Sequence, residues 1–385
     1  MDKGALRKSL RLFEDNNARF AVIKLLSCNG TESVTFSDAS CGFEVLTDEN
    51  KTPCFVPFTE IFEKGISFLR EIENNSCEKI ERLQGPTKDA LLCLERFYKS
   101  KEQSEASLRK VFDMGGECKP RVLETDITLC LAEHLLRRLA PRESCVLNNM
   151  FKGNNCRCGC QKEPMFSPTG IGHELVWHGF VDIIFSSHQG MSAIAYTVVE
   201  SKENSPKKRK RDEVDDRLDD DSQRRTTEDL KQKSPDYKLE EAFAQTIVFS
   251  LTENQKHPNC LNHMVPNIVI SPEKFEIVLY DAERDVLLCS NSIFLFNLDL
   301  PEHRSLTNEA IIILWMVLHY EIFCSGLEKA SDDVLVKCKS NFKSLVENKW
   351  DIYSNSLKIS VLEFNPVKRW SVNELLRRGH QLNLH

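Results

Sequence analysis

The sequence predicts an α/β fold, in which a mixed β-sheet is flanked by helices. Two neighbouring segments, 175–185 and 193–202, consist mainly of β-branched and aromatic residues, as is typical of strands in a buried sheet. The helical pattern at 239–251 is apolar on almost every side in its second half, which predicts that it packs against that sheet. Two further β-rich segments follow at 267–270 and 275–280. Helices and strands that alternate along a chain favour a layered α/β architecture.

The length of 385 residues favours two or three domains. We divide the chain into a helical N-terminal region at 1–117, a core at 118–300, and a helical C-terminal region at 301–385. The other expected elements are helices at 58–72, 87–98, 123–139 and 307–323, and strands at 20–26 and 286–289, the last at an edge of the sheet.

The composition, 41% hydrophobic and 28% charged, is that of an ordinary soluble globular protein. The net charge of −7 argues against a generally basic coat protein for nucleic acid, so any such binding must be local. No apolar segment reaches the length of a transmembrane helix and the first residues lack a signal-peptide pattern, so we expect no membrane partner. Fifteen cysteines at irregular spacings, without a secretion signal, predict reduced thiols in the cytosol or nucleus.

Charged side chains interrupt the two expected strands of the core, with Asp182 in the first and Glu200 and Lys202 at the end of the second. Because side chains alternate across a strand, Glu200 and Lys202 face the same side. Buried charges are costly unless they pair or hold a metal ion, so this placement is the strongest functional signal in the sequence. A tight hairpin turning at 186–190 would pair Asp182 with a residue well before Glu200, so bringing the carboxylates together requires a wide loop or a bulge.

The pattern Gly179-Phe-Val-Asp182-Ile-Ile, followed by Val-Val-Glu200-Ser-Lys202, resembles the PD-(D/E)xK nuclease superfamily, which has the restriction-endonuclease-like fold. The resemblance implies that Asp182 and Glu200 bind Mg²⁺ or Mn²⁺ and that Lys202 lies beside the attacking water. Val181 stands where the nominal motif has Pro, although many members lack that Pro. The resemblance covers roughly the middle half of the chain, and it implies the element order helix, strand, strand, strand, helix, strand.

Two further site residues follow from the resemblance. In that family a helix before the Asp-bearing strand often supplies another acidic ligand, and Glu133 fits that place; the alternative is an exposed glutamate that favours the helix. In one subgroup a Gln on the helix after the Glu-x-Lys strand lies near the active site, and Gln245 fits that place; the alternative is a core amide with structural hydrogen bonds. Glu124 is interpreted only as a favourable charge in a first helical turn.

The resemblance therefore implies an enzyme, a metal-dependent nuclease that hydrolyses phosphodiester bonds of nucleic acid, with DNA expected rather than RNA. Its catalytic residues would be Lys202, Glu200, Asp182 and Gln245, and its metal ligands Asp182, Glu200 and Glu133. One alternative is a catalytically inactive protein of the same fold that binds nucleic acid or protein in the nucleus. Another is an interaction protein in which Glu200 and Lys202 form an ion pair on an edge strand.

Cys156, Cys158 and Cys160 alternate in a segment rich in Asn, Gly and Lys. Three thiols at this spacing could bind Zn²⁺, with Cys145 or His173 as the fourth ligand. The Cys-x-x-Cys pairs of zinc ribbons are absent, so a loop of reduced thiols is the alternative.

The composition changes abruptly after Lys202, since 203–236 has few large apolar residues and is predicted to be a disordered insertion. It contains a run that resembles a nuclear import signal, formed by Lys207, Lys208, Arg209, Lys210 and Arg211. An import receptor with an acidic groove could bind this run. The alternative is a segment that binds phosphates without specificity, which the adjacent acidic run opposes. We therefore expect a nuclear protein, with a share in the cytoplasm.

Overall fold

The computed structural model of the protein describes most of the chain in separate stretches. The described residues are 18–47, 51–74, 83–113, 122–186, 192–198, 237–259, 262–297, 305–327 and 338–359. The motif residues Glu200 and Lys202 and the insertion at 203–236 lie outside them.

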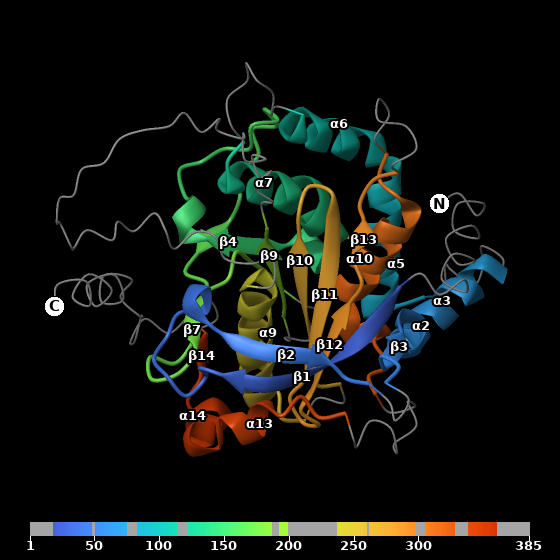
Figure 1. Ribbon diagram of the computed structural model, residues 1–385. Coiled ribbons are helices and arrows are strands. Elements are labelled where there is room, and N and C mark those ends of the chain that lie inside the picture. Colours follow the sequence, from blue (N-terminus) through green and yellow to red (C-terminus); the bar gives the residue numbers. More distant parts are fainter. Residues whose placement is uncertain are drawn as a thin grey trace, which may run out of the picture.

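A large mixed sheet forms the centre of the described structure (Figure 1). Its 11 strands are β1 (Arg19–Cys28), β2 (Cys41–Val45), β3 (Phe55–Pro57), β4 (Cys145–Asn148), β5 (Phe166–Ser167), β8 (Ile183–Phe185), β9 (Ala193–Thr197), β10 (Met264–Ile270), β11 (Lys274–Asp281), β12 (Val286–Ser290) and β13 (Ile293–Phe294). The strand order is β2-β1-β12-β11-β10-β9-β8-β4-β5, with β3 paired to β1 and β13 paired to β11. β9 runs parallel to β10 and β4 parallel to β5, whereas the other pairs are antiparallel. The expected fold class, a mixed sheet flanked by helices, is confirmed.

The helices agree with the periodicity of the sequence. They are α2 (Phe58–Ile61), α3 (Glu63–Asn74), α5 (Gly85–Lys99), α6 (Lys101–Phe112), α7 (Glu124–Leu131), α8 (Arg137–Leu139), α9 (Tyr237–Lys256), α10 (Asn308–Leu318), α11 (Tyr320–Phe323), α13 (Phe342–Leu345) and α14 (Trp350–Asn355). A π-helical segment, η2 (Ala132–Leu136), joins α7 to α8. The expected helix at 307–323 is divided at His319 into α10 and α11.

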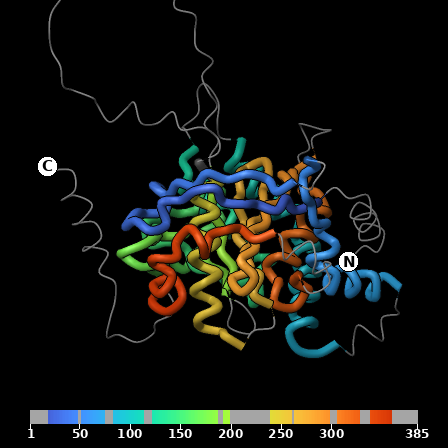
Figure 2. Tube along the Cα trace, turned by 60° about the horizontal axis from the view of Figure 1, so that its bottom comes forward, coloured from blue at the N-terminus to red at the C-terminus, as the bar shows by residue number. Residues whose placement is uncertain are grey.

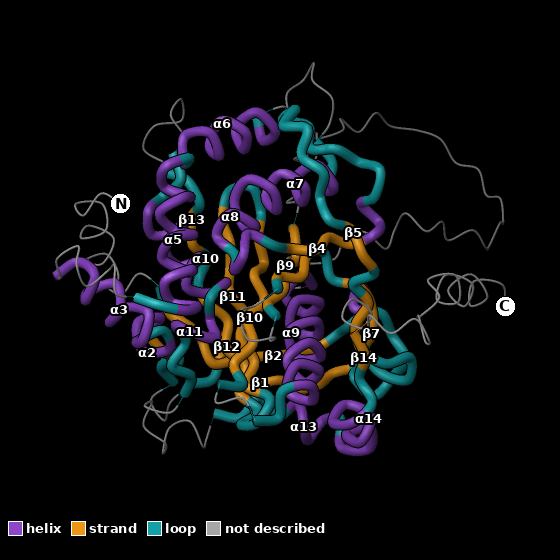
Figure 3. The backbone as a smooth tube through the Cα atoms, turned by 180° about the vertical axis from the view of Figure 1, so that it is seen from behind, coloured by secondary structure: helices purple, strands orange, loops and turns teal. Residues whose placement is uncertain are grey.

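Helix α9 crosses over between the parallel strands β9 and β10 and packs on β10 and β11 (Figure 3). Phe243 on this helix also contacts Phe43 of β2, with ring centroids 5.1 Å apart. Helix α14 packs against α9 as well. Other elements therefore surround α9 on several sides, and this agrees with the burial that its apolar sequence pattern predicts.

The N-terminal region contributes strands to the same sheet as the core. β1 lies between β2 and β12, and Phe20 pairs with Ser290. Figure 2 shows these N-terminal strands in blue beside the orange strands, although the two segments are far apart in the sequence. The region 1–117 is therefore not helical throughout, and β12 is an interior strand, where the sequence predicts an edge.

A second sheet has the order β14-β6-β7, formed by β6 (Gly170–Gly172), β7 (His178–Phe180) and β14 (Lys358–Ile359). The expected strand at 175–185 is consequently divided between two sheets, since β7 belongs to the small sheet and β8 to the large one. The residues between them, Val181 and Asp182, form the passage from one sheet to the other.

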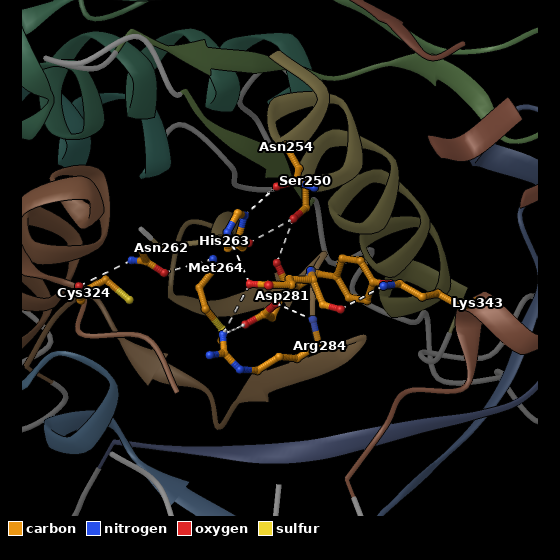
Figure 4. A network of polar contacts seen from close by, with 11 residues as sticks. Ser250, Asn254, Asn262, His263, Met264, Asp281, Arg284, Cys324 and Lys343 are labelled. Carbon is orange, nitrogen blue, oxygen red and sulfur yellow. Dashed lines mark hydrogen bonds and ion pairs between the residues drawn. The ribbon is translucent and has the colours of Figure 1, made fainter. Parts of the chain in front are cut away.

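A polar network closes one end of the large sheet (Figure 4). At the turn after β11, Oδ1 of Asp281 accepts the backbone N–H groups of Glu283 at 2.9 Å and Arg284 at 2.8 Å. Ser250 of α9 donates to the carbonyl of Tyr280 at 2.8 Å, which fixes the helix to the same end. Such bonds give hydrogen-bond partners to backbone groups at the end of β11 and in the turn that follows it. This network therefore has a structural role.

Glu253, near the end of α9, is a buried carboxylate at the start of β9. Its Oε2 accepts the backbone N–H of Ser192 at 2.7 Å. Burial is the largest influence and raises the pKa of Glu253 to about 7, although the hydrogen bond from Ser192 opposes the rise.

We predict that Glu253→Gln makes the stability of the protein less sensitive to pH. Since the pKa of Glu253 is raised from 4.5 to about 7 by folding, the stabilisation from its protonated form is complete below 4.5 and is lost as the pH rises through 7. A shift of this size corresponds to a loss on the order of 3 kcal/mol. Urea unfolding at about pH 5 and about pH 8 should show the variant gaining stability relative to the wild type at the higher pH. A stability difference that is the same at both pH values would contradict this account.

Candidate functional site

Asp182 lies at the end of β9 that is opposite to Glu253. Its Oδ2 accepts the backbone N–H of Thr197, the last residue of β9, at 2.7 Å. β8 and β9 pair with Ile183 opposite Ala195, so Asp182 lies beside residues that precede Glu200, as the hairpin geometry predicts. Asp182 as a whole residue is partly buried, while its carboxyl group is withdrawn from solvent.

Two other carboxylates lie near Asp182, one from each of two helices. Burial of the carboxyl group is the largest influence and raises the pKa of Asp182 to about 7, and the charges of Glu124 and Glu241 raise it further. The hydrogen bond from Thr197 acts in the opposite direction. Glu124 is exposed at the start of α7, and Glu241 is partly buried near the start of α9. Three acidic groups from segments that are far apart in the sequence thus influence one another electrostatically.

Gln245 lies one helical turn after Glu241 and is buried. Its Nε2 donates to Oε1 of Glu241 at 3.2 Å, and Tyr196 of β9 donates its hydroxyl to Oε2 of the same carboxylate at 2.9 Å. Oε1 of Gln245 is buried and has no hydrogen-bond partner among the described residues. The amide is therefore only half satisfied, which differs from the core amide of the alternative interpretation.

Glu133 is buried, so it is not the exposed glutamate of the alternative interpretation. Its Oε1 lies 3.3 Å from Nη1 of Arg137, one turn later on the helix. Its charge contributes, after burial, to raising the pKa of Cys145 to about 12, which places it near the start of β4. Along the helix Glu133 lies nine residues after Glu124, about 13 Å of helical rise. Glu124, and not Glu133, is the glutamate of this helix whose charge acts on Asp182.

Glu200 and Lys202 lie outside the described residues, although they follow Thr197 closely in the chain. The basic run at 207–211 lies outside them as well.

A second cluster lies between η2 and the segment after β4. His134, Cys156, Cys158 and Cys160 each offer one ligand atom, and these atoms all lie within 4.8 Å of one another. Nε2 of His134 is 3.0 Å from Sγ of Cys158, and Sγ of Cys156 is 3.3 Å from the same sulfur. Three of the four residues are buried. This group could hold a metal ion.

The fourth member of the cluster is His134, whereas the sequence predicted Cys145 or His173. Cys145 is part of β4, where it pairs with Phe185. His173 accepts the backbone N–H of Leu175 at 3.2 Å in the turn before β7. Both lie close to the three cysteines in sequence, but the partner in space is on the preceding helix. The spacing Cys130-x-x-x-His134, which places both side chains on one face, is the signal that could have identified it.

The cysteine sulfurs interact strongly with one another. A hydrogen bond from Cys130 is the largest influence and lowers the pKa of Cys156 to about 4; burial opposes the change, and hydrogen bonds from His134 and Cys158 assist it. Burial is the main reason why the pKa of Cys158 is raised to about 12. Thiolates are the form of cysteine that binds metals.

Comparisons of the chain with protein families, with curated proteins and with solved structures find no match. No described helix combines the length and the apolar composition that a membrane crossing requires. Any function must be argued from the residues of this chain.

We predict that Asp182→Asn and Asp182→Ala have different effects on stability in the absence of metal. Asn removes a charge near Glu124 and Glu241 but keeps an acceptor for Thr197, so it should be at least as stable as the wild type at about pH 8. Ala leaves that N–H group without its acceptor and should be less stable than the Asn variant by about 1–3 kcal/mol. Urea unfolding in buffer with a chelator measures both. Equal stability of the two variants would show that the hydrogen bond does not matter.

Proposed function

We propose that the chain is a metal-dependent nuclease of the restriction-endonuclease-like type, which hydrolyses phosphodiester bonds of nucleic acid. The observation that carries the proposal is the hydrogen bond of 2.7 Å between the Thr197 N–H and the Asp182 carboxylate. It fixes an acidic side chain to the end of β9, three residues before Glu200 of the sequence Glu200-Ser-Lys202. Asp182 is thus held next to the segment that carries the other motif residues.

The order of the elements supports the proposal. The elements α7, β4, β8, β9, α9 and β10 follow one another as helix, strand, strand, strand, helix, strand, when β5 and the small-sheet strands β6 and β7, which lie between β4 and β8, are set aside. This is the order that the resemblance to the nuclease superfamily implies. Asp182 directly precedes the second of the three strands, and Glu200 and Lys202 follow the third.

The donor atoms around Asp182 suit a hard divalent cation. Mg²⁺ and Mn²⁺ prefer oxygen ligands, and the charged neighbours of Asp182 are the carboxylates of Glu124 and Glu241. Among the described residues no three carboxylates lie within 4.8 Å of one another. The proposed site therefore needs Glu200 as its second acidic ligand.

In this proposal Asp182 and Glu200 hold the ion, while Lys202 orients the attacking water and stabilises the developing negative charge. The ion, when bound, supplies charge neutralisation at the phosphate and makes a bound water more acidic. Glu241 is a positioning residue, because its two oxygens accept hydrogen bonds from Tyr196 and from Gln245.

The proposed substrate is DNA rather than RNA, and the proposed location is the nucleus, with a share in the cytoplasm. Because the net charge is −7, contacts with phosphates must come from local basic groups and not from the protein as a whole. We assign the entry into the nucleus to an import receptor that binds the basic run at 207–211.

We predict that Asp182→Asn lowers metal-dependent cleavage by about 100-fold or more, the scale of one lost electrostatic contact in a transition state. Lys202→Ala should also abolish cleavage but leave Mn²⁺ binding nearly unchanged, because it removes no ligand. Glu253→Gln is the matched control, since it neutralises the carboxylate at the other end of β9 and should retain activity. Labelled single- and double-stranded DNA and RNA, with Mg²⁺ or Mn²⁺ and with a chelator blank, provide the assay.

Equal cleavage by the wild type, Asp182→Asn and Lys202→Ala would identify a contaminating nuclease and contradict the proposal. A wild-type protein that binds Mn²⁺ and nucleic acid but does not cleave any substrate would contradict the enzymatic function. That outcome would instead establish the inactive binding protein of the nuclease fold.

We predict that replacing Lys207, Lys208, Arg209, Lys210 and Arg211 with Ala abolishes nuclear accumulation of the chain. The reason is that an acidic receptor groove binds such a run through its charge. The chain has a mass of 44.2 kDa, so a larger fluorescent fusion should be used to suppress passive entry. Undiminished nuclear accumulation of the altered fusion would exclude this run as the import signal.

A further inference from the structure

We propose that His134, Cys156, Cys158 and Cys160 form a structural zinc site. Their ligand atoms lie within 4.8 Å of one another and consist of one imidazole nitrogen and three sulfurs. Three Cys and one His are a usual ligand set of structural Zn²⁺ in proteins. The proposal is independent of the nuclease function, because none of these residues belongs to the Asp182 site.

The donor atoms select zinc over the ion proposed for Asp182. Thiolates and imidazole are soft or intermediate ligands that favour Zn²⁺, whereas Mg²⁺ requires oxygen. In a tetrahedral site with Zn–S bonds of about 2.3 Å the sulfurs lie about 3.8 Å apart. Sγ of Cys156 and Sγ of Cys158 are 3.3 Å apart, so a shift of a few tenths of an ångström accommodates the ion. Four protein ligands leave no position for water, as expected of a site that stabilises structure.

The backbone conformation of the cysteine segment, 156–160, brings its three thiols close together. Gly159, between Cys158 and Cys160, has a φ of +81°, a left-handed conformation that few other residues adopt easily. Lys110 of α6 donates to the carbonyl of Cys158 at 2.6 Å. Arg157 lies 2.9 Å from Asp126 of α7. These contacts hold the segment against α6 and α7. They also bring the cations Lys110 and Arg157 to the segment. Three thiolates carry more negative charge than a Zn²⁺ ion carries positive charge, so nearby cations favour the occupied site.

His134 reaches the site from the π-helical segment η2, a feature that is often found at functional positions. Cys130 lies one turn before it, and its thiol donates to the carbonyl of Ser107 at 3.7 Å. Cys130 is not within the common contact distance of the four ligands. Cys130 is therefore not counted among the four ligands.

Zinc at this position would fasten an irregular segment to the core. Residues 152–165 between η4 (Asn149–Phe151) and β5 have no helix or strand of their own. A segment with so little backbone pairing needs another source of stability, and zinc binding provides folding free energy directly. The ion would join this segment to η2 and, through Arg157, to the first turn of α7.

The test is the zinc content and zinc affinity of the full chain, purified under reducing conditions without an affinity metal. We expect about one zinc per chain by elemental analysis. Cys160→Ser, at the most exposed of the four ligands, should lose bound zinc, with an affinity at least about 100-fold lower. Cys130→Ala changes a neighbouring thiol outside the four ligands and should keep one zinc per chain. Cys145→Ala is the matched control, a buried thiol outside the cluster, and should bind zinc like the wild type.

A second measurement uses cobalt in place of zinc. Co²⁺ bound by the wild type should show thiolate-to-metal charge-transfer absorption, weakened in Cys160→Ser; if that variant does not fold, the wild-type spectrum decides. A folded wild-type chain that stays free of zinc after incubation with Zn²⁺, or Co²⁺ binding without charge-transfer absorption, would overturn the proposal. So would Cys160→Ser with wild-type affinity, or loss of zinc in Cys145→Ala.

Discussion

Two carboxylates hold the strand β9 in place, and the candidate active site depends on this arrangement. Glu253 accepts the N–H of Ser192 at the start of the strand, and Asp182 accepts that of Thr197 at its end, each at 2.7 Å. Desolvation raises both pKa values to about 7, so each group is costly to ionise in the folded chain. Glu253 lies in the core near the start of β9, whereas Asp182 lies beside Thr197, three residues before Glu200 in the sequence.

Helix α7 and its π-helical continuation connect the two candidate sites. The helix begins at Glu124, whose charge acts on Asp182, and continues to His134 in the cysteine cluster. Between them Asp126 pairs with Arg157 of the cysteine segment. An ion at the cluster would therefore fix the start of the helix as well, and with it the backbone that carries Glu124. The two sites have different chemistry, since one offers oxygen and the other sulfur and nitrogen.

The sequence predicted those helices and strands that are specified by residues close together in the chain. The helices α3, α5 and α9 and the strands β10 and β11 were predicted because periodicity and turn residues are local signals. The pairing of β1 with β12 was not, since no local pattern specifies a partner far along the chain. For the same reason His134 was missed as the partner of the cysteines. Glu200 and Lys202 stay predictions.

The central claim is that Asp182 and Glu200 bind one divalent cation at the end of β9. A crystal structure of the protein grown with Mn²⁺, with anomalous scattering to locate the ion, tests it most directly. The account predicts an anomalous peak about 2.1 Å from a carboxylate oxygen of Asp182 and of Glu200, with Lys202 on the same side. A well-ordered site without such a peak, or with Glu200 turned to the opposite face of the sheet, would contradict the account.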